Sequence, residues 1–80
     1  MTWNYRVVRY DDKDGERRFA IREAYYGGPG DIPDMITAED MPPGGEDVQE
    51  LEADLRRMLD ALQKPVIDAA TRREIRGGNQ

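Results

Sequence analysis

Two runs of aromatic and β-branched residues near the N-terminus constrain the fold more than any other part of the sequence. They are WNYRVVRY (3–10) and FAIREAYY (19–26), and the turn-forming segment DDKDGE separates them. A three-residue loop KDG, with Gly15 in the left-handed conformation, would place Asp12 opposite Glu16. The sequence therefore predicts a β-hairpin in which the numbers of facing residues sum to 28.

This register assigns alternate residues to opposite faces of the sheet. We expect the mainly apolar face to be buried, with Arg9 opposite Phe19 near the turn; its members are Trp3, Tyr5, Val7, Ile21, Glu23 and Tyr25. We expect the small, polar and basic face to point outward; its members are Asn4, Arg6, Val8, Tyr10, Arg18, Ala20, Arg22 and Ala24. Glu23 interrupts the apolar face. Either it accepts a structural hydrogen bond from Tyr5, a backbone amide of the helix start or an arginine, or this end of the strand is hydrated.

The middle of the chain predicts a short strand and one amphipathic helix. Glycine and proline dominate residues 27–45, which leaves MITA (35–38) as a short edge strand. Residues 47–63 place apolar side chains on one helical stripe, which we expect to form the core: Val48, Leu51, Leu55, Met58, Leu59 and Leu62. Asp47 and Glu50 have the spacing of a capping box, so Asp47 is the predicted structural cap.

The residues after the helix allow a fourth strand. Pro65 ends the helix, PVI (65–67) can return along the sheet, and DAATRREIR (68–76) can add a helical turn before a flexible GGNQ. The predicted fold is α+β: a three- or four-stranded antiparallel sheet packed on one helix in ββ(β)α order. We assign residues 1–68 to a single domain and residues 69–80 to a partly flexible C-terminal extension.

Composition excludes several chemistries. The 80 residues include neither cysteine nor histidine, which removes disulfides, thiol nucleophiles and the usual zinc ligands. We therefore expect no catalytic residue, no cofactor and no metal; the acids Asp31, Asp34, Glu39 and Asp40 are scattered in a loop and are expected to be solvated. The sequence has no apolar run of signal or membrane length, so the expected location is the cytoplasm.

The basic face of the hairpin is the candidate binding surface, and its members are Arg6, Tyr10, Arg18 and Arg22. Because like charges facing each other on a sheet are unfavourable, acids must lie nearby. These acids either come from the 27–45 loop or belong to a partner. The net charge of −5 disfavours nucleic acid. The expected partner is thus an unidentified protein, with the chain itself a monomer or weak homodimer.

The segments WNYRVVR, FAIREAYY and LRRMLDALQKPVID carry a resemblance over residues 3–68. Together they resemble a small bacterial protein family with a W-N-Y-R-V start and an A-L-x-K-P-V helix end, which implies no activity. The order of hairpin, third strand and helix also resembles the N-terminal domain of HicB-type antitoxins, which implies a toxin-blocking role. We expect a non-catalytic interaction or regulatory module; the alternative is a weak binder of nucleic acid or a phosphoryl ligand.

Overall fold

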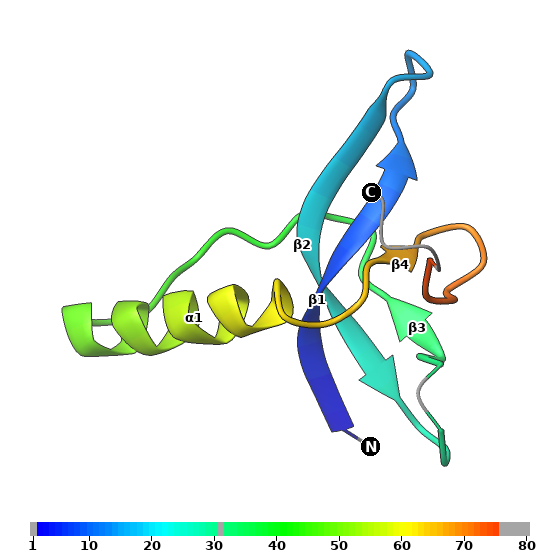
Figure 1. Cartoon of the computed structure of the whole chain (residues 1–80). Helices are drawn as coiled ribbons and strands as arrows, with labels where there is room; N and C mark the ends of the chain where they lie inside the picture. Colours follow the sequence, from blue (N-terminus) through cyan, green and yellow to red (C-terminus); the bar gives the residue numbers. More distant parts are fainter. Residues whose placement is uncertain (1, 31, 76–80) are drawn as a thin grey trace.

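The structure, a computed structural model, describes residues 2–30 and 32–75 and has the α+β fold that the sequence predicts (Figure 1). Its elements are β1 (Thr2–Asp11), β2 (Arg17–Tyr26), β3 (Met35–Ile36), α1 (Val48–Ala61) and β4 (Ile67–Asp68). The sheet order is β3-β2-β1-β4, with β1 and β4 parallel and the other neighbours antiparallel. The four-stranded alternative is therefore confirmed, in the order ββ(β)αβ.

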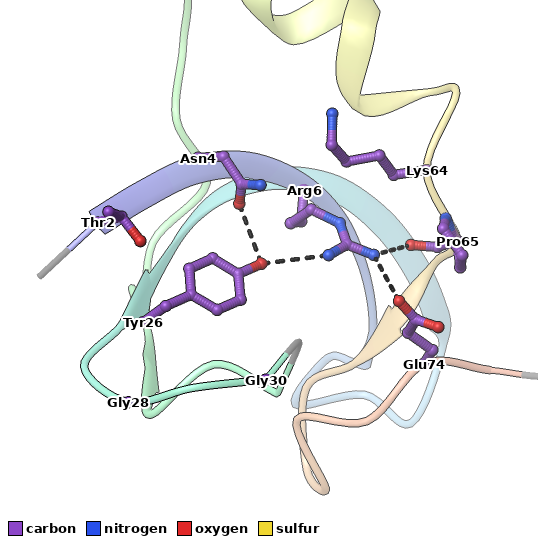
Figure 2. A pocket seen from close by; sticks show the side chains of 9 residues that line it. All are labelled: Thr2, Asn4, Arg6, Tyr26, Gly28, Gly30, Lys64, Pro65 and Glu74. Atoms are coloured by element: carbon purple, nitrogen blue, oxygen red, sulfur yellow. Dashed lines mark hydrogen bonds and ion pairs between the residues drawn. The ribbon is translucent and has the colours of Figure 1, made fainter.

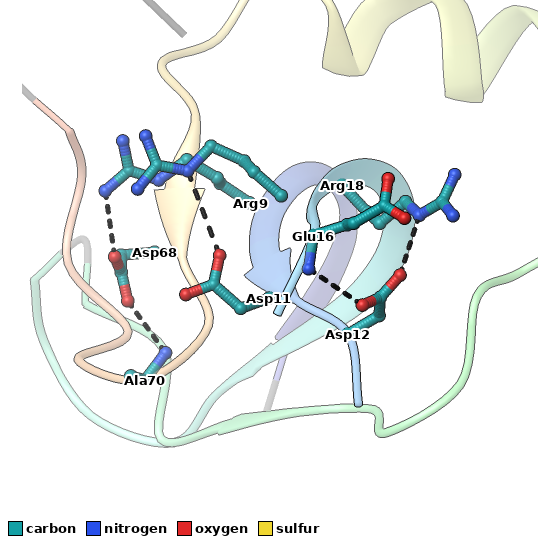
Figure 3. Close-up of polar contacts among 8 residues, drawn as sticks. Arg9, Asp11, Asp12, Glu16, Arg18, Asp68 and Ala70 are labelled. Atoms are coloured by element: carbon teal, nitrogen blue, oxygen red, sulfur yellow. Dashed lines mark hydrogen bonds and ion pairs between the residues drawn. The ribbon is translucent and has the colours of Figure 1, made fainter. Parts of the chain in front are cut away.

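The hairpin has the predicted register. Tyr5 faces Glu23 and the Asp12 and Glu16 backbones meet at 2.9 Å, while Gly15 has a φ of 81°. The Asp12 carboxylate accepts hydrogen bonds from the Glu16 backbone at 2.9 Å and from Arg18 Nε at 3.0 Å (Figure 3). These bonds, the backbone one first, lower the pKa of Asp12 below its ordinary value. A charged turn residue thus holds the loop closed.

The prediction of one buried and one outward face is wrong in the middle of the strands and also at one end, where Trp3 of the expected buried face is 46% exposed. Arg6, Val8 and Ala24 belong to the predicted outer face, and all three are buried. The sheet curves around Arg6, so this side is concave (Figure 2). The opposite face contributes Tyr5 and Val7 to the main core cluster, which is completed by Met58, Ala61 and Val66. Curvature lets a four-stranded sheet bury residues on both faces, which a flat hairpin could not do.

The third strand lies where the sequence predicts it, but it is shorter. β3 pairs with β2 through Met35 and Ile36. Single backbone hydrogen bonds extend the contact, because Thr37 N donates to Glu23 at 3.0 Å and Met41 N donates to Ile21 at 2.9 Å. The segment therefore follows β2 over a longer distance than its strand assignment suggests, and β3 is an edge of the sheet.

The C-terminal segment forms a turn at the opposite sheet edge, and the helical turn predicted in residues 68–76 is present as a single turn. Arg72 N donates to the Asp68 carbonyl at 2.7 Å, which is the i to i+4 bond of one helical turn. The Asp68 carboxylate caps this turn by accepting from Ala70 N at 2.8 Å, and it also accepts from Arg9 at 3.1 Å (Figure 3). A backbone hydrogen bond of 2.8 Å from Ile75 N to the Val66 carbonyl then returns the chain to the residues before β4. The predicted flexible GGNQ lies outside the described residues.

The prediction that the apolar stripe of the helix forms the core is also wrong. Of the six residues expected there, Met58 is the one that is buried; the buried helix residues are Asp54, Met58 and Ala61. The C-terminal half of α1 lies against β1, and its N-terminal half extends away from the sheet (Figure 1). The helix is therefore oriented so that most of its leucines point away from the sheet, toward solvent.

We expect Gly45→Ala to destabilise the fold. A β-carbon at Gly45 would lie 2.6 Å from the Leu51 backbone nitrogen, so the loop or the helix start must shift. The expected loss in the free energy of unfolding is about 1 to 3 kcal/mol, measured by denaturant melts. Gly44→Ala is the matched control, because a β-carbon at Gly44 meets nothing within 4 Å. Equal stability of the two variants would contradict the close approach.

We expect Asp47→Ala to lower the free energy of unfolding by about 1 kcal/mol. The Asp47 side chain accepts a 2.8 Å hydrogen bond from Glu50 N, which confirms the predicted cap. The Glu50 carboxylate binds Glu46 N at 3.0 Å, one residue before the position of an ideal capping box. Asp47→Ser keeps a capping oxygen and should retain most of the stability in the same melts. A melting curve for Asp47→Ala that matches that of the parent would show that the Asp47 cap does not stabilise the helix.

Candidate functional site

An exposed apolar strip on α1 is the first candidate surface, and we call it the leucine face. Its members and their exposed fractions are Val48 (79%), Leu55 (47%), Leu59 (61%) and Leu62 (60%). They follow one another at intervals of seven, four and three residues, so they share one side of the helix. Glu52 and Arg56 line the strip and pair with each other at 2.9 Å. A folded protein rarely leaves such a strip uncovered without a partner.

A polar anchor fixes which side of α1 faces the sheet. The Tyr5 hydroxyl donates a 2.6 Å hydrogen bond to Asp54, and Gly44 N donates to the other carboxylate oxygen at 3.0 Å. Arg57 adds an ion pair of 3.3 Å. The bond from Tyr5, the largest influence, lowers the pKa of Asp54. Because Asp54 must face the sheet to keep these partners, the leucine face points away from it.

The concave side of the sheet contains the second candidate, which we call the Arg6 pocket. Figure 2 shows its lining, and its volume is about 380 Å³. The lining residues are Thr2, Asn4, Arg6, Tyr26, Gly28, Gly30, Lys64, Pro65 and Glu74. Arg6 is only 4% exposed and its guanidinium donates to the Pro65 carbonyl at 2.7 Å and to Tyr26 at 3.1 Å. Its remaining nitrogen, Nε, has no hydrogen-bond partner among residues 2–30 and 32–75.

Among the described residues that line the Arg6 pocket, the charges sum to +1, because Arg6 and Lys64 face one acid, Glu74. The contact between Arg6 and Glu74 is long, at 3.5 Å, and Glu74 is partly exposed. Hydrogen-bond donors on the amide of Asn4 and the hydroxyl of Thr2 also line the pocket. This combination can hold a small anion, although the protein as a whole has a net charge of −5.

The structure separates the four predicted binding residues. Arg6 lies in its pocket, whereas Arg22 stacks over Tyr10 at 4.2 Å and pairs with Asp40 at 3.1 Å. Arg18 binds Asp12 in the hairpin turn. An acid of the 27–45 loop thus neutralises Arg22, which is one of the two alternatives that the sequence left open. Their role in binding stays a prediction.

Glu23 has a partner that the sequence analysis did not name. The Tyr25 hydroxyl donates to its carboxylate at 2.5 Å, and this bond raises the pKa of Tyr25. Tyr5, which we had considered as its donor, binds Asp54 instead. Glu23 is partly buried, and its side chain has a structural partner as expected.

Asp54 and Glu74 are the polar residues that sequence reasoning missed. A signal for Asp54 was present, since it lies four residues before Met58 on the buried side of the helix. Glu74 reaches the Arg6 pocket only because the chain turns back after β4, and no local sequence pattern predicts that turn. Among residues 2–30 and 32–75 no cluster of three or more acids, histidines or cysteines could hold a metal. Asp31, one of the loop acids, lies outside this range.

No protein-family model, curated protein or solved structure matches this chain. Within the part of the chain that the structure describes, no helix combines the length and apolarity needed to cross a membrane. The resemblances drawn from the sequence therefore remain predictions.

Proposed function

We propose that this protein is a small non-catalytic interaction module that docks through the leucine face of α1. The observation that carries the proposal is the exposure of Leu55, Leu59 and Leu62 on a helix that extends away from the sheet. Covering them would recover hydrophobic free energy of about 25 cal/mol for each Å² of apolar surface buried. The module would then belong to the proteins that bind an amphipathic helix.

The spacing of the leucine face supports a helical occupant. Apolar residues at intervals of seven, four and three match the seam between two packed helices. The strip carries one acid and one base, Glu52 and Arg56, so it also favours an occupant that presents charges of both signs. An extended strand would instead seek an open sheet edge, such as β3.

Photo-crosslinking in the native cell tests this proposal. A photoreactive residue at Leu59 should give one discrete adduct, while the same residue at the exposed turn position Lys13 should give none. Adding Leu55→Lys should abolish the Leu59 adduct, because a charge in the seam opposes burial. A Leu59 variant without an adduct, or one with an adduct insensitive to Leu55→Lys, would overturn the proposal.

A second function, binding of a small phosphoryl anion, is supported by the Arg6 pocket. Its local charge of +1 and its volume suit a ligand the size of inorganic phosphate or slightly larger. Inorganic phosphate should shift the amide signals of Asn4 and Lys64 in an NMR titration. Lys64→Gln should remove the shifts and Lys13→Gln should not. Equal shifts in the two variants would leave only non-specific binding.

A further inference from the structure

We infer that the occupant of the leucine face is a second copy of this chain, with the two α1 helices antiparallel. This inference rests on the proposed function and names its partner. The leucine face is hollowed at its centre, where a depression of about 310 Å³ is lined by Glu52, Leu55, Arg56 and Leu59. A two-fold axis through this depression brings the same four residues of both copies together, as an isologous interface requires.

Charge selects the antiparallel orientation. In a parallel pair in register, each Glu52 would face its own copy, and like charges at a helix seam are unfavourable. In the antiparallel pair Glu52 lies beside Leu59 of the partner and within one helical turn of the partner's Arg56. Each copy already pairs Glu52 with Arg56 at 2.9 Å, so the two ion pairs can exchange across the axis without loss of charge balance. The face is therefore electrostatically complementary to itself.

The shape of the molecule favours the same orientation. The sheet packs against the C-terminal half of α1, and the N-terminal half lies clear of the sheet (Figure 1). Antiparallel pairing lays the N-terminal half of each helix beside the C-terminal half of the other and keeps the two sheets at opposite ends. Parallel pairing would place both sheets at the same end. Leu62 of one copy then covers Val48 of the other.

The seam is short, since a helix of 14 residues spans about 21 Å. Such an interface is smaller than a standard stable one, so the dimer should form reversibly and depend on concentration. Sedimentation equilibrium of the full chain should show a monomer–dimer mixture. Leu59→Lys should weaken the dimer at least tenfold, whereas Ala53→Lys, exposed on another side of α1, should leave it unchanged.

Charge exchange tests self-complementarity. Glu52→Arg and Arg56→Glu should each weaken the dimer. In each variant, positions 52 and 56 carry the same sign of charge, so like charges meet across the two-fold axis. The double variant should restore dimerisation, since both signs are exchanged in both copies. A double variant as weak as the single ones would overturn the pairing. The pairing would also be overturned if both single variants dimerised with a dissociation constant as low as that of the parent chain.

Cysteine crosslinking tests orientation, because the chain has no cysteine of its own. Val48→Cys mixed with Leu62→Cys should form a disulfide-linked heterodimer, and neither variant alone should crosslink. The reason is that residues fourteen apart along a helix are separated by about 21 Å. Efficient crosslinking of either variant alone would show a parallel pair and overturn the inference.

The outcomes separate this inference from the proposed function. A chain that remains monomeric while its Leu59 photo-adduct contains another protein would overturn self-pairing and leave the interaction module standing. Absence of any Leu59 adduct would overturn both. An adduct with twice the mass of the chain, lost in Glu52→Arg and restored in the double variant, is the expected result.

Discussion

Replacing Arg6 by methionine is expected to lower the free energy of unfolding by about 2 to 4 kcal/mol. Arg6 is buried on the concave side of the sheet and donates to the Pro65 carbonyl at 2.7 Å. Methionine fills part of the space but cannot donate, so this carbonyl and the Tyr26 hydroxyl lose a partner. The Arg6 contacts also tie β1 to the segments on either side of β4, and that connection is lost.

Denaturant melts measure the effect, with Arg18→Met as the matched control. Arg18 is exposed and pairs with Asp12 in the turn, so its replacement should change the free energy of unfolding by no more than about 0.5 kcal/mol. Glu74→Gln separates the ion pair from the hydrogen bonds. Because the contact between Arg6 and Glu74 is 3.5 Å long and Glu74 is partly exposed, we expect a small loss. Equal losses in the free energy of unfolding for Arg6→Met and Arg18→Met would mean that the contacts of Arg6 do not hold β1 to the segments around β4.

Local patterns were sufficient to predict the hairpin, its register and the helix cap. The loop at Gly15 fixes the pairing of β1 with β2, because a short turn with a left-handed glycine permits one register. The Asp47 cap depends on residues three positions apart. These features can be predicted without knowledge of distant segments, because the alternation of side chains along a strand and the spacing of residues along a helix determine them.

Burial could not be predicted in the same way, because it depends on how distant segments meet. Arg6 looks like a surface residue in its strand, yet the curvature of the sheet and the return of residues 65–75 enclose it. The leucine face has the spacing of a core stripe, but the Tyr5–Asp54 bond turns another side of α1 inward. A hydrophobic pattern identifies an apolar face and does not say whether this chain or another one covers it.

The second large effect is expected for Tyr5→Phe, which should lower the free energy of unfolding by about 1 to 3 kcal/mol. The Tyr5 hydroxyl is the donor that holds Asp54 against the sheet, at 2.6 Å. Phenylalanine preserves the packing of the ring against the core but leaves the carboxylate without this partner. Tyr10→Phe is the control, because the Tyr10 hydroxyl donates to the exposed Asp40, at 3.2 Å, and not to a buried acid.

The pH dependence of unfolding gives an independent measure of the same contact. Burial, followed by the hydrogen bond to Asp54, raises the pKa of Tyr5 to about 12. An unfolded tyrosine has a pKa of about 10, so folding disfavours the ionised form. The Tyr5 contribution to stability is therefore complete below pH 10 and is lost as the pH rises from about 10 to about 12.

The sign is opposite at the acid end. The pKa of Asp54 is lowered, so its contribution is present above its unfolded pKa and is lost as the pH falls through the folded value. Tyr5→Phe should reduce the slope of both limbs of the curve of unfolding free energy against pH, whereas Tyr10→Phe should leave them unchanged. Absorbance titration at alkaline pH should also lose its highest tyrosine pKa. If Tyr5→Phe keeps the alkaline limb of the parent, the hydroxyl does not anchor α1, and the orientation of the leucine face must have another cause.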